Sequence, residues 1–362
     1  MISVFVPSHI TGFFSIYDNE DPQLKGSLGA GVLLDKGVIT EIDFKDTSNN
    51  DSLNNSALND VSIIINGKKD EYNQVIVLKT IELMKKDQKV KGTDIDLSDV
   101  IVSQTIQVPI GCGFGTSAAS ALGTAISINE LLCLGLSMEE CGKYAHLAEV
   151  ELSTGLGDVI AEMSRGIVVR TKVGAPGYGE VRSILPQEKS AFKFSDSKSP
   201  LSDSLGRSSS LNDFYIITKS LGEIHTSSVL GNINQKKLIT QVGEEIGEEF
   251  NKKDDGIVIG SKFKNRFNVA VDSEFNEEET VKKFMNASIS FAKRTHLIGD
   301  ELLELVHMLH GKVIGSSMAM LGNTLFAIAN EEQKLKIEAE FYGEFDFYKL
   351  ETEGIRITVT DR

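Results

Sequence analysis

The spacing of apolar residues along the chain predicts a succession of strands and helices. Residues 100–108 alternate apolar and polar side chains, as in a half-buried strand, whereas residues 74–86 repeat apolar positions at helical intervals. Ser137, with Glu140 three residues later, predicts a capping box. The expected strands cover residues 2–6, 32–34, 61–66, 100–108, 167–171, 214–218, 325–329 and 355–360. The expected helices cover residues 74–86, 118–132, 137–152, 236–250, 278–294 and 300–310, and two more begin at Asp158 and Glu331.

Several polar or glycine-rich segments separate these elements. Residues 7–14 indicate a turn, residues 26–31 a glycine-rich bend, and residues 46–60 a solvated loop. Residues 186–212 are rich in serine and charge, which favours a domain boundary there. We therefore expect one domain at residues 1–190 and a second at 191–362. Strands that enclose helices in this order favour an α+β fold built from split βαβ units.

Composition and charge exclude several classes of partner. The chain has 362 residues, enough for two domains, and no apolar run near the ~20 residues that cross a bilayer. Its formal net charge of −15 disfavours nucleic acid and anionic membranes as partners. The three cysteines show no metal-ligand spacing, and the first residues lack the pattern of a signal peptide. These features predict a cytoplasmic protein.

Residues 109–121 carry the clearest chemical signal. Three glycines alternate there, and two hydroxyl residues then begin a helix. Glycine allows positive φ and a close approach of backbone to ligand, and a helix N-terminus presents unpaired N–H groups and the positive end of its dipole. This arrangement predicts an anion site, with phosphate as the usual ligand. The residues expected to bind phosphate are Gly111, Gly113, Gly115, Thr116, Ser117 and Ala118.

Other glycine motifs fit this stretch less well. A Walker A loop needs a lysine before Thr116 or Ser117, and a dinucleotide-binding fingerprint needs a different glycine spacing. A tight turn that merely starts a helix is the simpler alternative. Cys112, within the loop, invites a role as nucleophile, but a small residue between glycines is the favoured interpretation.

Polar residues after this helix form a second cluster of candidates. His146 and Glu149 are three apart on one helix and therefore share a face. Asp158 begins the next helix and could serve only as its cap, although Ala161 leaves it without a capping box. Arg170 lies near the end of a buried-looking strand.

The stretch from Pro109 to Ala119 is similar to the second motif of the GHMP kinases (galacto-, homoserine, mevalonate and phosphomevalonate kinases), P-x-x-x-G-[LF]-G-[ST]-S-A-A, at every fixed position. The first motif, P-G-[KRH], is matched loosely from Pro7 to His9, and the third, G-x-G-G-G, is replaced over residues 315–322. This departure resembles one branch of the family, the archaeal pantoate kinases. The chain is similar to that branch over residues 7–14, 111–117, 148–158, 174–179 and 317–324.

This resemblance implies the two-domain GHMP kinase fold. Its N-terminal domain is of the ribosomal protein S5 type, its C-terminal domain is ferredoxin-like, and the active site lies between them. It also implies that pantoate and ATP are converted to 4-phosphopantoate, a step toward coenzyme A in archaea. A kinase for another small acceptor, such as homoserine or a mevalonate relative, stays open, as do a non-catalytic sensor on this fold and a homodimer.

The resemblance assigns roles that the chemistry of the residues supports. Asp158 would orient or deprotonate the acceptor hydroxyl. Ser117 and Glu149 would supply two hard oxygen ligands to Mg²⁺, which usually keeps several of its waters.

The substrate carboxylate requires a local cation in so acidic a protein. Arg170 offers a bidentate fork for it. By resemblance, Ser27 and His146 would join Arg170 around the substrate, and His9 occupies the polar position of the first motif. The alternative for His9 is a histidine in a surface turn.

Overall fold

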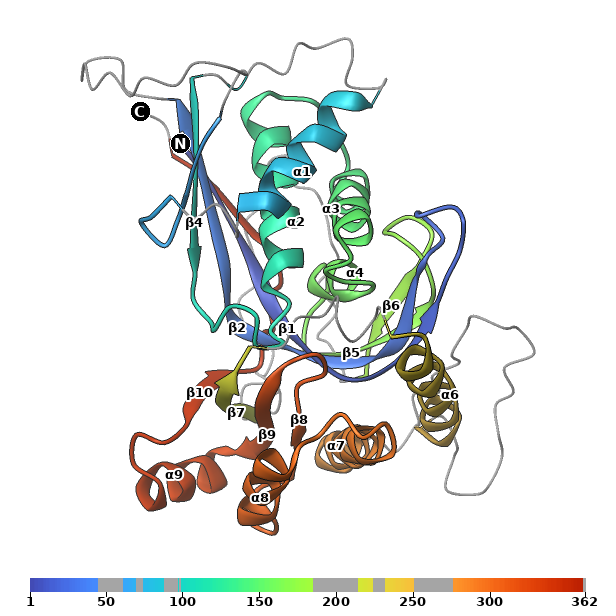
Figure 1. Ribbon diagram of the computed structural model, residues 1–362. Helices are drawn as coiled ribbons and strands as arrows, with labels where there is room; N and C mark the ends of the chain where they lie inside the picture. The colour runs from blue at the N-terminus through green and yellow to red at the C-terminus, as the bar shows by residue number, and fades with distance from the viewer. Residues whose placement is uncertain are drawn as a thin grey trace, which may run out of the picture.

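Two β-sheets, one in each half of the molecule, organise the described part of the chain (Figure 1). This computed structural model describes residues 1–44, 61–69, 74–87, 97, 99–184, 214–223, 232–250 and 276–360. The seven-stranded sheet contains β1 (Ile2–Tyr17), β2 (Gly26–Phe44), β3 (Ser62–Ile65), β4 (Val100–Ile106), β5 (Ile167–Lys172), β6 (Glu180–Ser183) and β11 (Arg356–Val359). The four-stranded sheet contains, in spatial order, β10 (Asp346–Lys349), β7 (Phe214–Gly222), β9 (Asn323–Asn330) and β8 (Gly315–Met318).

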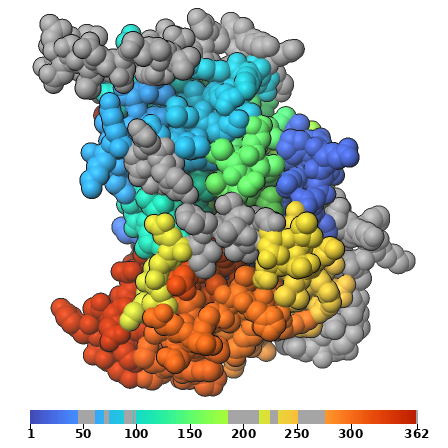
Figure 2. Space-filling view, in the orientation of Figure 1, coloured from blue at the N-terminus to red at the C-terminus, as the bar shows by residue number. Residues whose placement is uncertain are grey.

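Helices cover one face of the larger sheet and pack against the smaller one (Figure 1). The first group is α1 (Gln74–Lys86), α2 (Thr116–Leu131), α3 (Met138–Leu152) and α4 (Asp158–Glu162). The second is α6 (Ile233–Phe250), α7 (Glu277–Arg294), α8 (Asp300–Leu309) and α9 (Glu331–Glu340). Helix α6 packs on both β1 and α7, and Figure 2 shows it in yellow where the two halves meet. Within the described ranges, no helix has the length and apolar character to cross a membrane.

Strands β1 and β2 pair along almost their whole lengths and reach from the first half to its boundary with the second (Figure 1). Their register shifts between Pro7 and His9 and again between Thr11 and Phe13. The expected turn at residues 7–14 and the expected bend at 26–31 are therefore wrong, because both segments lie inside long strands. The backbone N–H of His9 donates to Phe114 O at 3.1 Å, which ties β1 to the glycine loop.

Most helices follow the predicted pattern. Helix α1 covers the expected residues 74–86, and the capping box of Ser137 and Glu140 at α3 is confirmed. The short strands β6, β8 and β10 were not predicted. The loop at residues 46–60 and the boundary at 186–212 lie outside the described residues, so the division near residue 190 stays a prediction. Strand β11, from the end of the chain, pairs with β1 in the larger sheet.

Helix α2 lies between the larger sheet and the neighbouring helices, and small residues let it pack closely there. Its Ala118, Ala121 and Ala125 are fully buried. The amide of Gln104 on β4 donates to Ser120 O at 3.0 Å, joining sheet and helix. The predicted α+β class is confirmed by this layered arrangement.

The contact between α6 and β1 predicts the effect of a substitution at Gly243. A Cβ at this residue would lie 2.1 Å from Phe14 O, a backbone atom that cannot move aside cheaply. Alanine normally stabilises a helix by about 1 kcal/mol relative to glycine. We expect Gly243→Ala to lower the free energy of unfolding instead, by about 1–3 kcal/mol, in denaturant titrations. Gly299→Ala is the control for added volume, because no atom lies within 4 Å of its added Cβ, and it should cost only the ~0.5 kcal/mol of a poorer N-cap for α8. Stability equal to or above wild type would contradict this close approach.

Candidate active site

The glycine loop before α2 has the backbone that an anion site requires. Gly111, Gly113 and Gly115 have φ of 73°, 86° and 67°, in the left-handed region that favours glycine. Gly115 is the N-cap of α2 and provides no side-chain cap, so the first N–H groups of the helix remain available. The three glycines line one pocket with Thr116 and Ser117.

The second half of the molecule supports this loop from the other side. A Cβ at Gly322 would lie 2.1 Å from Cys112 O, and one at Gly113 would lie 3.0 Å from the Cα of Gly322. The two backbones therefore touch, which only glycine permits. Cys112 is buried, and burial raises the pKa of its thiol, so the structure supports the packing interpretation over a nucleophile.

Asp158 begins α4 and lies in the same pocket. His9 Nδ1 lies 2.7 Å from Asp158 Oδ1, and the Thr11 hydroxyl donates to the same oxygen at 3.3 Å. Burial alone would raise the pKa of Asp158, but the hydrogen bond of His9, with the charge of Arg170 and the hydrogen bond of Thr11, outweighs it and lowers the pKa. The Asp158 side chain keeps 26% exposure. It is thus an ionised carboxylate that a substrate could reach.

His9 is a buried partner of Asp158. Its side chain has no exposure, so the alternative of a surface turn is wrong. Burial lowers the pKa of the imidazole more than Asp158 raises it, which makes His9 a neutral donor through Nδ1–H. The ring fits against β2 because residue 31 is a glycine. A Cβ at that position would lie 2.1 Å from His9 Nε2.

Arg170 on β5 is a buried cation that faces the same pocket. It is 1% exposed, and its Nη1 contacts Thr11 Oγ1 at 3.5 Å. Its Nε has no hydrogen-bond partner among the described residues, and the structure records no ion pair between Arg170 and any described carboxylate. Burying a guanidinium without a paired anion is costly, so this arrangement favours an anionic ligand.

Ser117 and Glu149 lie together beside the loop. Glu149 is 2% exposed, accepts a hydrogen bond from Thr154 at 2.6 Å, and has the Ser117 hydroxyl within hydrogen-bonding reach. Burial raises the pKa of Glu149 to about 7. A buried carboxyl beside a hydroxyl oxygen fits a hard divalent cation, which would favour the ionised form. No group of three or more His, Cys, Asp or Glu metal ligands occurs in the described segments.

The remaining predicted residues occupy different positions. Ser27 lines the pocket near Arg170, since a Cβ at Gly157 would lie 2.3 Å from Ser27 Oγ and 2.9 Å from Arg170 Nε. His146 does not line the pocket, and its Nε2 lies 3.1 Å from Pro22 O. Ala118 is fully buried in α2 behind the pocket wall.

Glu162, at the end of α4, is a buried group that the sequence did not single out. It has no exposure, and neither carboxyl oxygen has a hydrogen-bond partner among the described residues. Its Oε1 lies 2.4 Å from the position of a Cβ at Gly115. Burial, followed by the charges of Asp158 and Glu149, raises its pKa well above the ordinary value. Glu162 therefore packs behind the loop in surroundings that favour the neutral form of its carboxyl.

Known proteins are similar to this chain in sequence and architecture. The sequence model of the family described as GHMP kinases N terminal domain matches residues 75–166. A pantoate kinase of Methanocaldococcus jannaschii is 32% identical over 91% of this chain and 93% of its own length. The chain belongs to the pantoate kinase family. A pantoate kinase of Thermococcus kodakarensis is 30% identical over 93% of this chain and 90% of its own.

A solved structure supports the same assignment. A protein titled "Phosphotransferase related to CoA biosynthesis pathway" is 28% identical and superposes with a TM-score of 0.68, over 99% of this chain and 98% of that one. The expected two-domain GHMP kinase fold is thereby confirmed.

The buried acid Glu162 predicts how pH affects folding. A glutamate in an unfolded chain has a pKa of about 4.3, whereas burial raises that of Glu162 in the folded protein. Stability is therefore lost as the pH rises from about 4.3 through the raised folded-state pKa. Glutamine cannot ionise. From about pH 5 to about pH 8, wild type should therefore lose at least ~1 kcal/mol more of its free energy of unfolding than Glu162→Gln loses.

Denaturant titrations in metal-free buffer at both pH values would measure this difference. Exposed Glu139→Gln is the control and should follow wild type. If Glu162→Gln loses as much stability as wild type over this range, Glu162 is not a neutral acid in the folded state.

Proposed function

We propose that this protein is an ATP-dependent kinase that phosphorylates pantoate to 4-phosphopantoate, a step in coenzyme A biosynthesis. The names of its relatives support this substrate. The observation that carries the proposal is the position of Arg170, a buried cation with no described ion-pair partner, in the same pocket as Asp158 and the glycine loop. Such a pocket fits an acceptor that carries both a carboxylate and a hydroxyl.

The glycine loop would hold the phosphates of ATP through its backbone N–H groups and the N-terminus of α2. Phosphoryl transfer depends on positioning and charge stabilisation more than on covalent help from the protein. The oxygen of the acceptor's 4-hydroxyl would attack the γ-phosphorus as the bond to the ADP oxygen breaks. Asp158, ionised in the free protein, would take up the hydroxyl proton.

Ser117 and Glu149 would hold Mg²⁺ with the phosphates. When bound, the ion would neutralise phosphate charge. The proximity of the two side chains and the burial of Glu149 support this pair as ligands.

Arg170 and Ser27 would bind the pantoate carboxylate from β5 and β2. We propose that His9 acts through Asp158, because its Nδ1 contacts that carboxylate and its ring does not line the pocket. His146 would act indirectly, by holding the backbone at Pro22 that leads into β2 and its pocket residue Ser27. Because ATP is the proposed phosphoryl donor, we place the reaction in the cytoplasm.

The function is tested by ATP turnover with a panel of acceptors. With Mg²⁺, pantoate should yield 4-phosphopantoate by mass spectrometry, and homoserine and mevalonate should not be phosphorylated. Asp158→Asn should bind ATP as wild type does but lose ~10²–10⁴-fold in kcat, the usual scale for a general base. Transfer to another acceptor in preference to pantoate would refute the substrate. ATP binding without transfer to any acceptor would favour a sensor.

Arg170 provides a test of the carboxylate site. A charge-assisted pair contributes roughly 1.5–3 kcal/mol, and lysine keeps the charge but loses the planar fork. Arg170→Ala should raise the pantoate KM at least ~10-fold, and Arg170→Lys should recover only part of it, with little change in the ATP KM. If both KM values shift alike, or neither shifts, Arg170 does not bind the acceptor carboxylate.

A further inference from the structure

Five large apolar residues line the pocket with the charged residues. Phe114 and Leu321 lie where the glycine loop packs on Gly322, and the other three come from different parts of the chain. These three are Phe14, Leu156 and Met320. None of them has a part in binding phosphate or a carboxylate. Their positions beside Arg170 and Asp158 follow from backbone contacts.

Phe14 lies next to the guanidinium through Gly29. Phe14 on β1 pairs with Gly29 on β2, and Gly29 pairs on its other side with Arg170 on β5. A Cβ at Gly29 would lie 2.8 Å from both Arg170 Nη2 and the Cα of Phe14. Phe14 is 4% exposed, and its ring packs against that of Phe291, with ring centroids 5.6 Å apart.

Leu156 lines the pocket from the loop before α4. Its neighbour Gly157 passes so close to Ser27 Oγ and Arg170 Nε that any side chain there would collide with them. Leu156 is half-buried at the pocket wall, one residue before Gly157 and two before Asp158.

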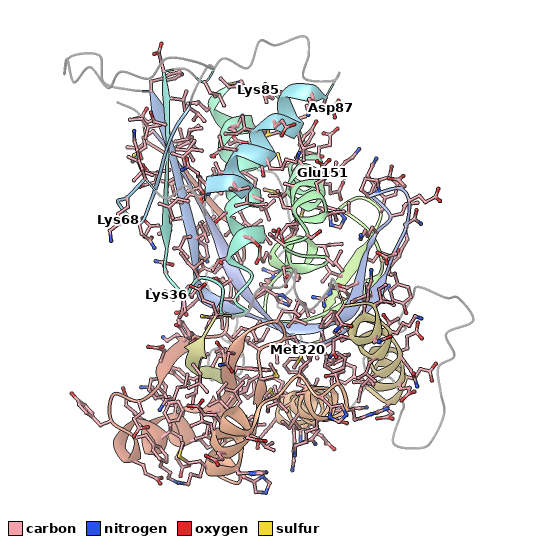
Figure 3. The ribbon with its side chains drawn as sticks, in the orientation of Figure 1. Lys36, Lys68, Lys85, Asp87, Glu151 and Met320 are labelled. Carbon is pink, nitrogen blue, oxygen red and sulfur yellow. The ribbon has the colours of Figure 1, made fainter. Side chains whose placement is uncertain are left out.

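Met320 comes from the second half of the molecule. Its backbone N–H donates to Thr11 O at 2.9 Å, and the Thr11 hydroxyl reaches Asp158 Oδ1 at 3.3 Å. Figure 3 labels Met320 where the two halves meet. Met320 belongs to residues 315–322, the segment that stands in place of the glycine-rich third motif. A large apolar side chain thus faces the pocket from this segment.

We propose that Phe14, Leu156 and Met320 form an apolar wall that selects an acceptor with a dimethyl-substituted carbon between its carboxylate and its reacting hydroxyl. This inference rests on the proposed function. In pantoate, the carbon next to the reacting C4 carries two methyl groups. With the carboxylate on Arg170 and the hydroxyl at Asp158, these methyl groups lie between the two charged residues. Each methyl or methylene group that fits an apolar pocket changes specificity by ~10–200-fold.

The test compares pantoate with 2,4-dihydroxybutanoate, which keeps the carboxylate and both hydroxyls and lacks the methyl groups. The ratio of kcat/KM for the two acceptors should be at least ~100 in wild type. Leu156→Ala and Met320→Ala should each lower this ratio at least ~10-fold, chiefly by reducing kcat/KM for pantoate. Phe14→Leu, which keeps a large apolar side chain in the core, should lower it by a smaller factor.

Leu321→Ala is the matched variant. Leu321 lines the same pocket but directly precedes Gly322, which packs on the glycine loop, so it should affect both acceptors alike and leave the ratio unchanged. The proposal is overturned if the ratio stays at the wild-type value in Leu156→Ala and Met320→Ala, or if Leu321→Ala lowers it equally. Wild-type transfer to pantoate with unchanged ratios in all variants would refute the wall and leave the proposed function standing. Failure of wild type to phosphorylate pantoate would refute both.

Discussion

The buried positive charge of Arg170 is the constraint around which the centre of this protein is built. A guanidinium removed from water needs compensating dipoles and charges, and among the described residues only Thr11 and the nearby charge of Asp158 supply them. Two glycines leave space for the Arg170 side chain, Gly29 on one side and Gly157 on the other. The fold thus holds a buried cation whose charge is only partly compensated. A bound anion would complete the compensation.

Local chemistry made part of this arrangement predictable from sequence. The glycine loop and the capping box at Ser137 depend on residues close together in the chain, and both have the expected structure. The predicted turn at residues 7–14 is wrong, also for a physical reason. Proline and clustered glycines usually end strands, but here two register shifts allow β1 to continue past Pro7. The glycines of β2 give close approach to His9 and Arg170 instead of a bend.

The remaining site residues could not be predicted, because their environments are created by packing between distant segments. No local pattern marks Glu162, which is buried by the loop at Gly115, 47 positions earlier in the chain. The burial of His9 follows from the pairing of β1 with β2. Met320 lines the pocket from a segment that a backbone hydrogen bond joins to Thr11 in the other half. A sequence can indicate which residues carry chemistry, but the neighbours that tune them depend on the assembled fold.

The pairing of β1 with β11 has a consequence for synthesis of the protein. Residues 2–5 pair with residues 356–359, so β1 has no partner on this edge of the larger sheet until those distant residues have been made. Ribosomes add roughly 5–20 residues per second, which leaves this edge without its partner for tens of seconds. An open strand edge is a template for pairing with other chains. The nascent protein therefore passes through a period in which its β1 edge is exposed to misassembly, and this period ends only after residues 356–359 have been made and paired.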